Sequence, residues 1–112
     1  MPLLTGVILA FSVTMLESKV YCVYIMASLS RAIYIGVSGD LANRVRLHKD
    51  GLIPGHTAKY KINRLVYYER FANPTEAIAR EKELKGWKRD RKIALIEHQN
   101  PQWLDLSADW QD

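Results

Sequence analysis

Two short strand-like stretches near the start of the chain constrain its fold most. Val20–Ala27 alternates along its length and is rich in Val, Tyr and Ile, and Ala32–Ser38 has the same character. Such residues favour β-strands. The polar segment Ser28–Arg31 separates the two stretches. We therefore predict a β-hairpin that carries one tyrosine on each strand, Tyr24 and Tyr34.

A helix is expected directly after the hairpin. Ser38 or Asp40 can supply the side-chain oxygen that caps a helix N-terminus. The helix should run to about Lys49 or Asp50. Gly51 is a natural stop, because glycine readily adopts the left-handed conformation at which many helices end.

The next segment predicts a loop followed by a third strand. Leu52–Asn63 contains Pro54 and Gly55, so we expect little regular structure there. Leu65–Phe71 is rich in branched and aromatic residues, which predicts a strand.

A helix-start signal follows this strand. Asn73 is in the capping position, Pro74 stands at the first helical position, and Glu76 completes a pattern similar to a capping box. This helix should extend to about Trp87.

A last helix is expected from Asp90, as its cap, to about His98. Beyond it, Trp103, Leu104 and Leu106 are expected to pack back on the body of the protein. The order β-β-α-β-α-α predicts a small α/β (α+β) domain, in which helices pack on a three-stranded, mostly antiparallel sheet.

Length and cysteine content bound the organisation of the chain. With 112 residues it fits one domain that can bury a core without disulfides. We expect residues 20–106 to form this domain, residues 1–19 an N-terminal extension and residues 107–112 an acidic tail. The single cysteine, Cys22, excludes an internal disulfide and a Cys-based zinc site.

The basic charge indicates a class of partner. The net charge is +4 overall and +7 between residues 20 and 98, where 15 Lys and Arg face 8 Asp and Glu. A polyanion is therefore the expected partner, nucleic acid before membrane. The alternative, on charge alone equally good, is a protein that is basic without such a partner.

The first residues are mostly apolar. Met1–Leu16 is too short for an ordinary membrane-spanning helix. We expect translation to start at Met15, so that the first fourteen residues are not native. A membrane-tethered form that uses this segment is the alternative.

One carboxylate falls on the apolar stripe of the predicted helix that begins after Asn73. Ala77, Ile78, Leu84 and Trp87 lie near one stripe at helical spacing, and Glu81 lies within it. An ionised carboxylate there is unfavourable unless it is paired or holds a metal. A divalent-metal ligand is one interpretation. A Glu at the stripe edge, bridged to a nearby Lys or Arg, is the other, and periodicity alone favours it.

Two residues of the first predicted helix share a face. Arg44 and His48 are four positions apart. A guanidinium can hold a phosphate through two hydrogen bonds, and an imidazole can move a proton near neutral pH. A solvated basic face, extended by Arg46 and Lys49, is the alternative, and the residues alone favour it.

A dense basic stretch surrounds Glu81 and continues beyond Trp87. It consists of Arg80, Lys82, Lys85, Lys88, Arg89, Arg91 and Lys92. Such a stretch can follow a phosphate backbone with salt-sensitive affinity, and an ordinary solvated helix face is the alternative. The expected nucleic-acid contacts are Lys85, Lys88 and Arg89, with Arg46 and Lys49 from the first helix.

Taken together, these positions resemble the GIY-YIG nuclease family over about Val20–Leu106. The likeness is to its small, single-domain bacterial members, which are related to the N-terminal nuclease domain of the UvrC excinuclease subunit. Val23-Tyr24 stands for the first motif and Tyr34-Ile35-Gly36 for the second.

Further positions match the family in order along the chain. Arg44 corresponds to the family's helix arginine, and His48 stands where the family has His or Tyr. Glu81 corresponds to the metal-binding glutamate, and Asn100 to a late asparagine that supports the site. There are two departures. Cys22 replaces the glycine of the first motif, and Val37 stands where some members carry a lysine, which leaves a lysine-assisted proton transfer in doubt.

The resemblance implies one-metal phosphodiester hydrolysis. Glu81 would hold Mg²⁺ or Mn²⁺, and Arg44 would stabilise the developing negative charge. Tyr24 or Tyr34 would activate or orient the water, with His48 as a proton partner. The sequence does not decide between the two tyrosines.

The resemblance also implies a nucleic-acid substrate, with DNA expected before RNA, a cytoplasmic location and a setting in DNA repair. No membrane partner is expected. The alternative from another class is a non-catalytic nucleic-acid-binding module with the same fold. The presence of Tyr24, Tyr34, Arg44 and Glu81 argues against this alternative. Nucleic-acid binding alone needs basic residues and does not need this combination of side chains.

Overall fold

The computed structural model describes residues 19–110 of the chain. Three strands form one sheet: β1 (Tyr21–Ala27), β2 (Ile33–Ser38) and β3 (Arg64–Phe71). Their order is β2-β1-β3, and both pairings are antiparallel, so the predicted hairpin and sheet are confirmed. The expected start at Met15 and the apolar segment Met1–Leu16 lie outside the described residues.

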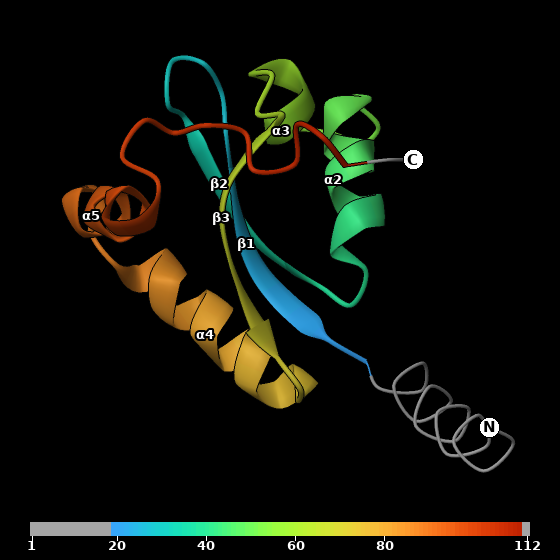
Figure 1. Cartoon of the computed structure of the whole chain (residues 1–112), viewed down its shortest axis with the longest axis vertical. Helices are drawn as coiled ribbons and strands as arrows, with labels where there is room; N and C mark the ends of the chain where they lie inside the picture. Colours follow the sequence, from blue (N-terminus) through green and yellow to red (C-terminus); the bar gives the residue numbers. More distant parts are fainter. Residues whose placement is uncertain (1–18, 111–112) are drawn as a thin grey trace, which may run out of the picture.

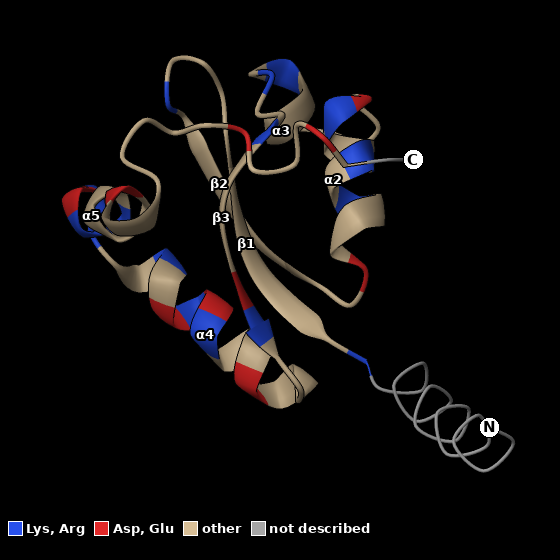
Figure 2. Ribbon diagram, in the orientation of Figure 1, with Lys and Arg blue, Asp and Glu red and all other residues tan. Residues whose placement is uncertain are grey.

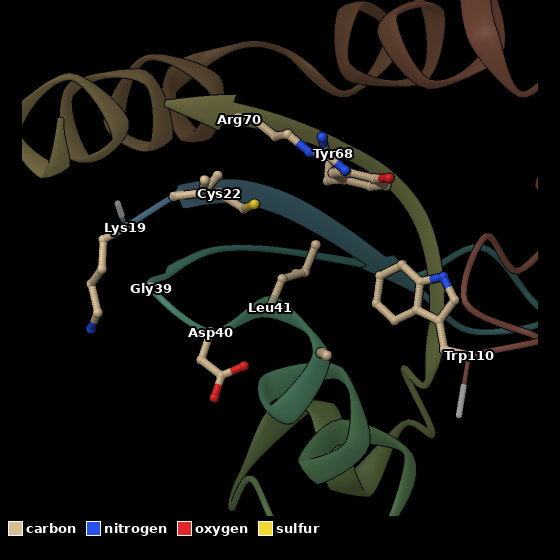
Figure 3. Close-up of a pocket in the computed structure, with 10 residues that line it drawn as sticks. Lys19, Cys22, Gly39, Asp40, Leu41, Tyr68, Arg70 and Trp110 are labelled. Carbon is tan, nitrogen blue, oxygen red and sulfur yellow. The ribbon is translucent and has the colours of Figure 1, made fainter. Parts of the chain in front are cut away.

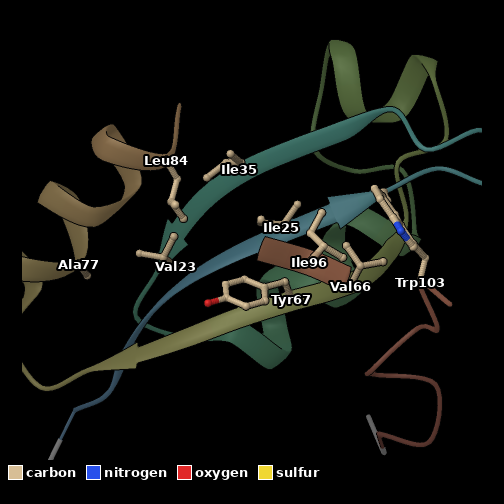
Figure 4. Packing of buried hydrophobic residues seen from close by; sticks show 10 residues of the cluster. Val23, Ile25, Ile35, Val66, Tyr67, Ala77, Leu84, Ile96 and Trp103 are labelled. Carbon is tan, nitrogen blue, oxygen red and sulfur yellow. The ribbon is translucent and has the colours of Figure 1, made fainter. Parts of the chain in front are cut away.

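The central strand, β1, divides the core into two clusters because its side chains alternate between the two faces of the sheet. Val23, Ile25 and Ala27 lie in the larger cluster, while Tyr24 and Met26 lie in the smaller one. All five are at most 1% exposed. Figure 4 shows Val23 and Ile25 among the other residues of the larger cluster. A one-residue shift in register would exchange the two sets, so this pattern fixes the pairing.

Helices cover both faces of the sheet (Figure 1). On the face of the larger cluster lie α4 (Pro74–Gly86) and α5 (Arg89–Gln99). On the opposite face lies α2 (Leu41–Lys49), together with the single turn α3 (His56–Lys59). The predicted α+β arrangement is therefore confirmed.

The helix starts follow local hydrogen bonds. Asp40 caps α2 by accepting a hydrogen bond from the backbone N–H of Asn43, and Asn73 caps α4 through the N–H of Thr75 at 2.7 Å. Gly51, with φ of 69°, ends the turn after α2. These three signals are the ones that the sequence predicts.

The segment Leu52–Asn63 has little regular structure, as predicted: only the single turn α3 forms there, around the buried Thr57, whose hydroxyl donates to the carbonyl of Ile53. One prediction about local structure is wrong. Asp90 does not cap α5. That helix begins at Arg89, since Lys88 is already the extended residue before it, and Asp90 lies in the first turn.

The tail confirms one expectation and corrects another. Trp103 is buried against the larger cluster, but Leu104 and Leu106 are 56% and 38% exposed. The side chain of Asn100 explains the difference. It binds the backbone N–H and C=O of Leu104 and the carbonyl of Val66, so the main chain is held and the Leu104 side chain points outward.

Candidate active site

Three rings from β1, β2 and α2 meet on the α2 side of the sheet. The ring centroids of Tyr24 and Tyr34 are 6.2 Å apart, and those of Tyr34 and His48 are 5.2 Å apart. Tyr24 and His48 meet edge to face at 5.6 Å. The structure thus brings together three of the residues that the sequence nominates, and we call them the ring cluster.

A buried hydrogen bond joins two members of the ring cluster. The hydroxyl of Tyr24 and Nε2 of His48 are 3.0 Å apart. The other ring nitrogen, Nδ1, is buried and has no hydrogen-bond partner within residues 19–110. An orphaned polar atom of this kind is costly and is a feature of functional sites.

Gly36 makes room for Tyr24. The two residues are directly opposite each other in the β1–β2 pairing. A Cβ atom at Gly36 would lie 2.6 Å from the Tyr24 hydroxyl oxygen and 2.7 Å from Cζ. The phenol therefore lies across the backbone of β2, the edge strand against which α4 also packs.

The electrostatic environment keeps both hydrogen-bonded groups uncharged. Burial raises the pKa of Tyr24 well above its usual range, and the neighbouring Tyr34 and Glu81 add to the rise while Arg44 opposes it. Burial, and then the positive charge of Arg44, lowers the pKa of His48. At neutral pH the pair is therefore a phenol and a neutral imidazole.

Arg44 and Glu81 are the other two residues that the sequence nominates as catalytic. Arg44, on α2, is exposed and forms no ion pair with any described residue. Its charge acts on both Tyr24 and His48. The side chain of Glu81, on α4, is 15% exposed, and its charge acts on Tyr24 from the opposite side of the sheet.

Glu81 also has a partner on its own helix. Nζ of Lys85 lies 3.2 Å from its carboxylate, one turn further along α4. This is the bridge to a basic residue that the sequence offers as the alternative to a metal ligand. Ile78, by contrast, is 43% exposed, so the apolar stripe is narrower than expected and rests on Ala77 and Leu84.

The donor set near Glu81 suits Mg²⁺ or Mn²⁺. Within residues 19–110, no group of three or more His, Cys, Asp or Glu side chains is arranged to enclose a metal ion. Mg²⁺ commonly binds one or two carboxylates and keeps water and substrate phosphate oxygens as its other ligands. A single, largely buried side chain such as that of Glu81 fits that habit.

Most of the expected nucleic-acid contacts already have partners in the protein. Arg46 binds Asp50 and Asn43, Lys49 binds Asp105, Lys85 binds Glu81, and Arg89 donates to the backbone carbonyl of Arg31. Lys88 is the exception among the five, at the start of α5. Figure 2 shows acidic residues interleaved with basic ones along α4.

Two further basic residues of that stretch are engaged. Arg80 forms a bidentate pair with Glu69 on β3 and also binds Glu83. The guanidinium of Arg91 lies 3.9 Å from the ring centre of Trp87. Arg80 and Arg91 therefore serve the packing of α4 and α5.

Asn100 and an unpredicted residue, Asp105, hold the tail. The described hydrogen bonds of Asn100 reach β3 and Leu104, not the ring cluster. Asp105 accepts from Lys49 on α2 and from the backbone N–H of Leu65 and of Ser107. The spacing Asp105-x-Ser107 is the signal for such a turn, because Asp often binds the backbone two residues on.

No helix within the described part of the chain is long and apolar enough to cross a membrane. The sheet and the helices on its two faces define a small α+β domain, in which the ring cluster is the candidate site.

Comparison with known proteins identifies the family. The family model for the GIY-YIG catalytic domain matches residues 20–94, and the chain belongs to this family. The UPF0213 protein of Staphylococcus saprophyticus is 32% identical over 74 residues, which cover 66% of this chain and 90% of that protein. The UPF0213 protein of Clostridium perfringens is 34% identical over 74 residues, covering 66% and 80% of the two chains.

A solved structure has the same fold. The solution NMR structure of the UPF0213 protein BH0048 from Bacillus halodurans aligns with a TM-score of 0.51 and 24% identity, over 82% of this chain and 99% of that one. The relatives are small UPF0213 proteins, and the match of this chain to the GIY-YIG model confirms the family that the sequence predicts.

Proposed function

We propose that this protein is a divalent-metal-dependent endonuclease that hydrolyses phosphodiester bonds in nucleic acid, with DNA as the expected substrate. The observation that carries the proposal is the ring cluster of Tyr24, Tyr34 and His48, within electrostatic reach of Arg44 and Glu81. Membership of a nuclease-type family supports it.

Glu81 is the residue that would hold Mg²⁺ or Mn²⁺. When bound, such an ion supplies Lewis-acid polarisation of a phosphate oxygen and stabilises the leaving group. Arg44, exposed and without an ion pair among the described residues, is available to hold a non-bridging phosphate oxygen and to stabilise the charge that develops there.

The two tyrosines have different surroundings, which supports different roles. Tyr24 is 1% exposed and burial raises its pKa, so it remains a protonated phenol at neutral pH and has no phenolate with which to take a proton from water. Tyr34 is only partly buried and can meet water. We assign Tyr34 to orienting the attacking water and moving its proton, with neutral His48 beside it as the acceptor. Tyr24 positions His48 through their hydrogen bond.

The experiment is a cleavage assay with Glu81→Gln. The parent chain is incubated with a panel of single-stranded, nicked and branched DNA and RNA in Mg²⁺, Mn²⁺ or EDTA. We expect divalent-dependent cleavage by the parent and its loss in Glu81→Gln. Glu83→Gln is the matched control, because Glu83 lies on the same helix and pairs with Arg80 at the exposed surface.

One observation favours the second candidate, a non-catalytic nucleic-acid-binding module. The Lys85 ammonium forms an ion pair with the carboxylate of Glu81, on which metal binding would depend. If the parent binds the panel but cuts nothing in either metal, the nuclease proposal fails and the binding module stands. If Glu81→Gln cuts like the parent, Glu81 is not the metal ligand.

A further inference from the structure

A groove lies on the same face of the sheet as the ring cluster but on another side of α2. It is lined by the start of β1, the N-terminus of α2, the end of β3 and the tail residue Trp110. Figure 3 shows Tyr68 and Arg70 on β3 with Trp110 facing them along the groove. Tyr68 is directly opposite Tyr24 in the β1–β3 pairing, so the groove begins one strand away from the ring cluster.

The groove combines an aromatic corner with cations. Tyr68 and Trp110 stand edge to face, with ring centroids 6.3 Å apart. The guanidinium of Arg70 lies 5.8 Å from the Tyr68 ring centre. Lys19 lines the same end. Neither Lys19 nor Arg70 forms an ion pair within residues 19–110, in contrast to most cations of α2 and α4.

The groove continues along α2. A second hollow shares Asp40, Ala42 and Trp110 with the first and passes Arg46 and Lys49. Trp110 therefore stands where the two hollows join, and it is 37% exposed while the two other tryptophans pack on the larger cluster. A partly exposed aromatic ring, beside cations that have no ion pair within residues 19–110, suits a flat, negatively charged ligand.

We propose that this groove binds an unpaired nucleotide of a nucleic-acid strand, with its base stacked on Trp110 in the corner formed by Tyr68 and its phosphate held by Arg70 and Lys19. Bases splayed out of a helix are commonly held in this way, by aromatic stacking with a basic residue at the phosphate. The carboxylate of Asp40 at the rim can accept a hydrogen bond from a base amino group. The inference deepens the proposed function, because it selects substrates with a single-stranded segment.

The test compares affinities for single-stranded and duplex probes in EDTA, where cleavage cannot occur. The probes are a labelled oligodeoxynucleotide, the oligoribonucleotide of the same sequence and the blunt DNA duplex. We expect Trp110→Ala to weaken binding of the single strands by roughly 5- to 150-fold, the range for loss of one stacked base, with little effect on the duplex. The two single-stranded probes show whether the sugar matters.

Matched variants exclude general effects. Leu106→Ala removes a tail side chain of nearly the same exposure, 38%, that does not line the groove. Arg70→Gln should lower the single-strand affinity more than the duplex affinity, whereas Lys82→Gln makes the same charge change outside the groove and should leave their ratio unchanged. Far-UV circular dichroism checks that each variant is folded.

Tryptophan fluorescence gives an independent readout. Oligothymidine should quench the emission of the parent, and Trp110→Phe should abolish most of that quenching. An oligoglutamate peptide should not reproduce it. Equal single-strand affinity in parent and Trp110→Ala, equal losses for single strand and duplex, or equal quenching by the peptide would each overturn the groove assignment.

The result is separable from the proposed nuclease activity. A parent chain that shows the Trp110-dependent preference for single strands but cuts nothing supports the groove and sinks the nuclease. If the parent cleaves in a metal-dependent way but substitution of Trp110 or Arg70 does not change binding, the nuclease proposal is supported and the groove assignment fails.

Discussion

The phenol of Tyr24 lies across Gly36, so close that a Cβ atom at Gly36 would be 2.6 Å from the hydroxyl oxygen. Gly36→Ala must therefore displace the ring that binds His48. We expect a loss of about 1–3 kcal/mol in the free energy of unfolding, as for other overpacked cores, together with a severe loss of cleavage. Urea denaturation and the cleavage assay measure the two effects.

Gly86→Ala provides the control for that substitution. Nothing lies within 4 Å of a Cβ built at Gly86, the last residue of α4. The change should be neutral or stabilise by up to about 1 kcal/mol, since alanine loses less backbone entropy in a helix. Equal behaviour of the two alanine variants would show that the contact between Gly36 and Tyr24 does not matter.

Removing only the hydroxyl group should have different effects at Tyr24 and at Tyr34. Tyr24→Phe removes the hydrogen-bond partner of His48 Nε2, while Nδ1 already has none among the described residues, so the free energy of unfolding should fall by about 1–3 kcal/mol. Tyr34→Phe should leave stability nearly unchanged and lower cleavage while nucleic-acid binding survives. Thermal unfolding and single-turnover cleavage of both variants test this, and a fully active Tyr34→Phe would make Tyr34 a sheet residue only.

Stability should fall on mild acidification because of His48. Its pKa is below the ordinary value of 6.5 in the folded protein, as burial and Arg44 disfavour the imidazolium. The unfolded chain therefore binds the proton first as the pH falls through 6.5, and the free energy of unfolding decreases until the lower folded pKa is passed.

His48→Gln tests the source of that pH dependence. The parent and the variant are unfolded in urea at several values between about pH 8 and pH 5, the range in which histidine titrates. The variant should show a flatter dependence. Parallel curves would assign the effect to other groups. Glu69 and Asp105, whose pKa values are lowered by their hydrogen bonds despite burial, destabilise the fold only at lower pH.

Lys85 should compete with the metal for Glu81. Lys85→Gln removes the ammonium that lies 3.2 Å from that carboxylate. Because a partly exposed ion pair contributes about 0.2–1 kcal/mol, the Mg²⁺ concentration at half-maximal cleavage should fall by up to about fivefold. A metal titration of parent and variant measures it, with Lys82→Gln as the control on the same helix. A higher metal requirement would contradict the pairing.

The basic stretch after Glu81 makes a separate prediction about salt. If Lys85, Lys88 and Arg89 contact phosphates, replacing all three with Gln should weaken binding to every sequence alike. Each lost contact should make the log K against log salt slope shallower by about 0.7 to 0.9. A salt titration on a duplex measures this. An unchanged slope would redirect attention to Arg46, Lys49, Lys59 and Lys61.

Local signals carried most of the fold. Alternation in Val20–Ala27 and the start signal at Asn73-Pro74 act through nearest neighbours, so the sequence alone predicts them correctly. The packing of Leu104 and the start of α5 depend on distant partners. Asn100 reaches across to Val66 on β3, and no periodicity encodes that bond.

The candidate site follows the same rule. Spacing alone places Arg44 and His48 on one face of a helix, but the contact of His48 with Tyr24 joins residues 24 positions apart. The groove at Trp110 could not be predicted, because it forms only where β3, α2 and the tail meet. The sequence also could not predict that Lys85 and Arg89 bind partners within the protein, since a basic residue in a sequence does not show which acid or carbonyl it will bind.

The candidate site is assembled from both sides of the sheet: the phenols and imidazole lie with α2, and the carboxylate arrives on α4. During synthesis the hairpin and α2 leave the ribosome well before α4 does. A nascent or truncated chain that stops short of α4 would therefore hold the tyrosines without Glu81. Under the proposed function, hydrolytic capacity therefore requires that α4 has been synthesised and has docked on the sheet.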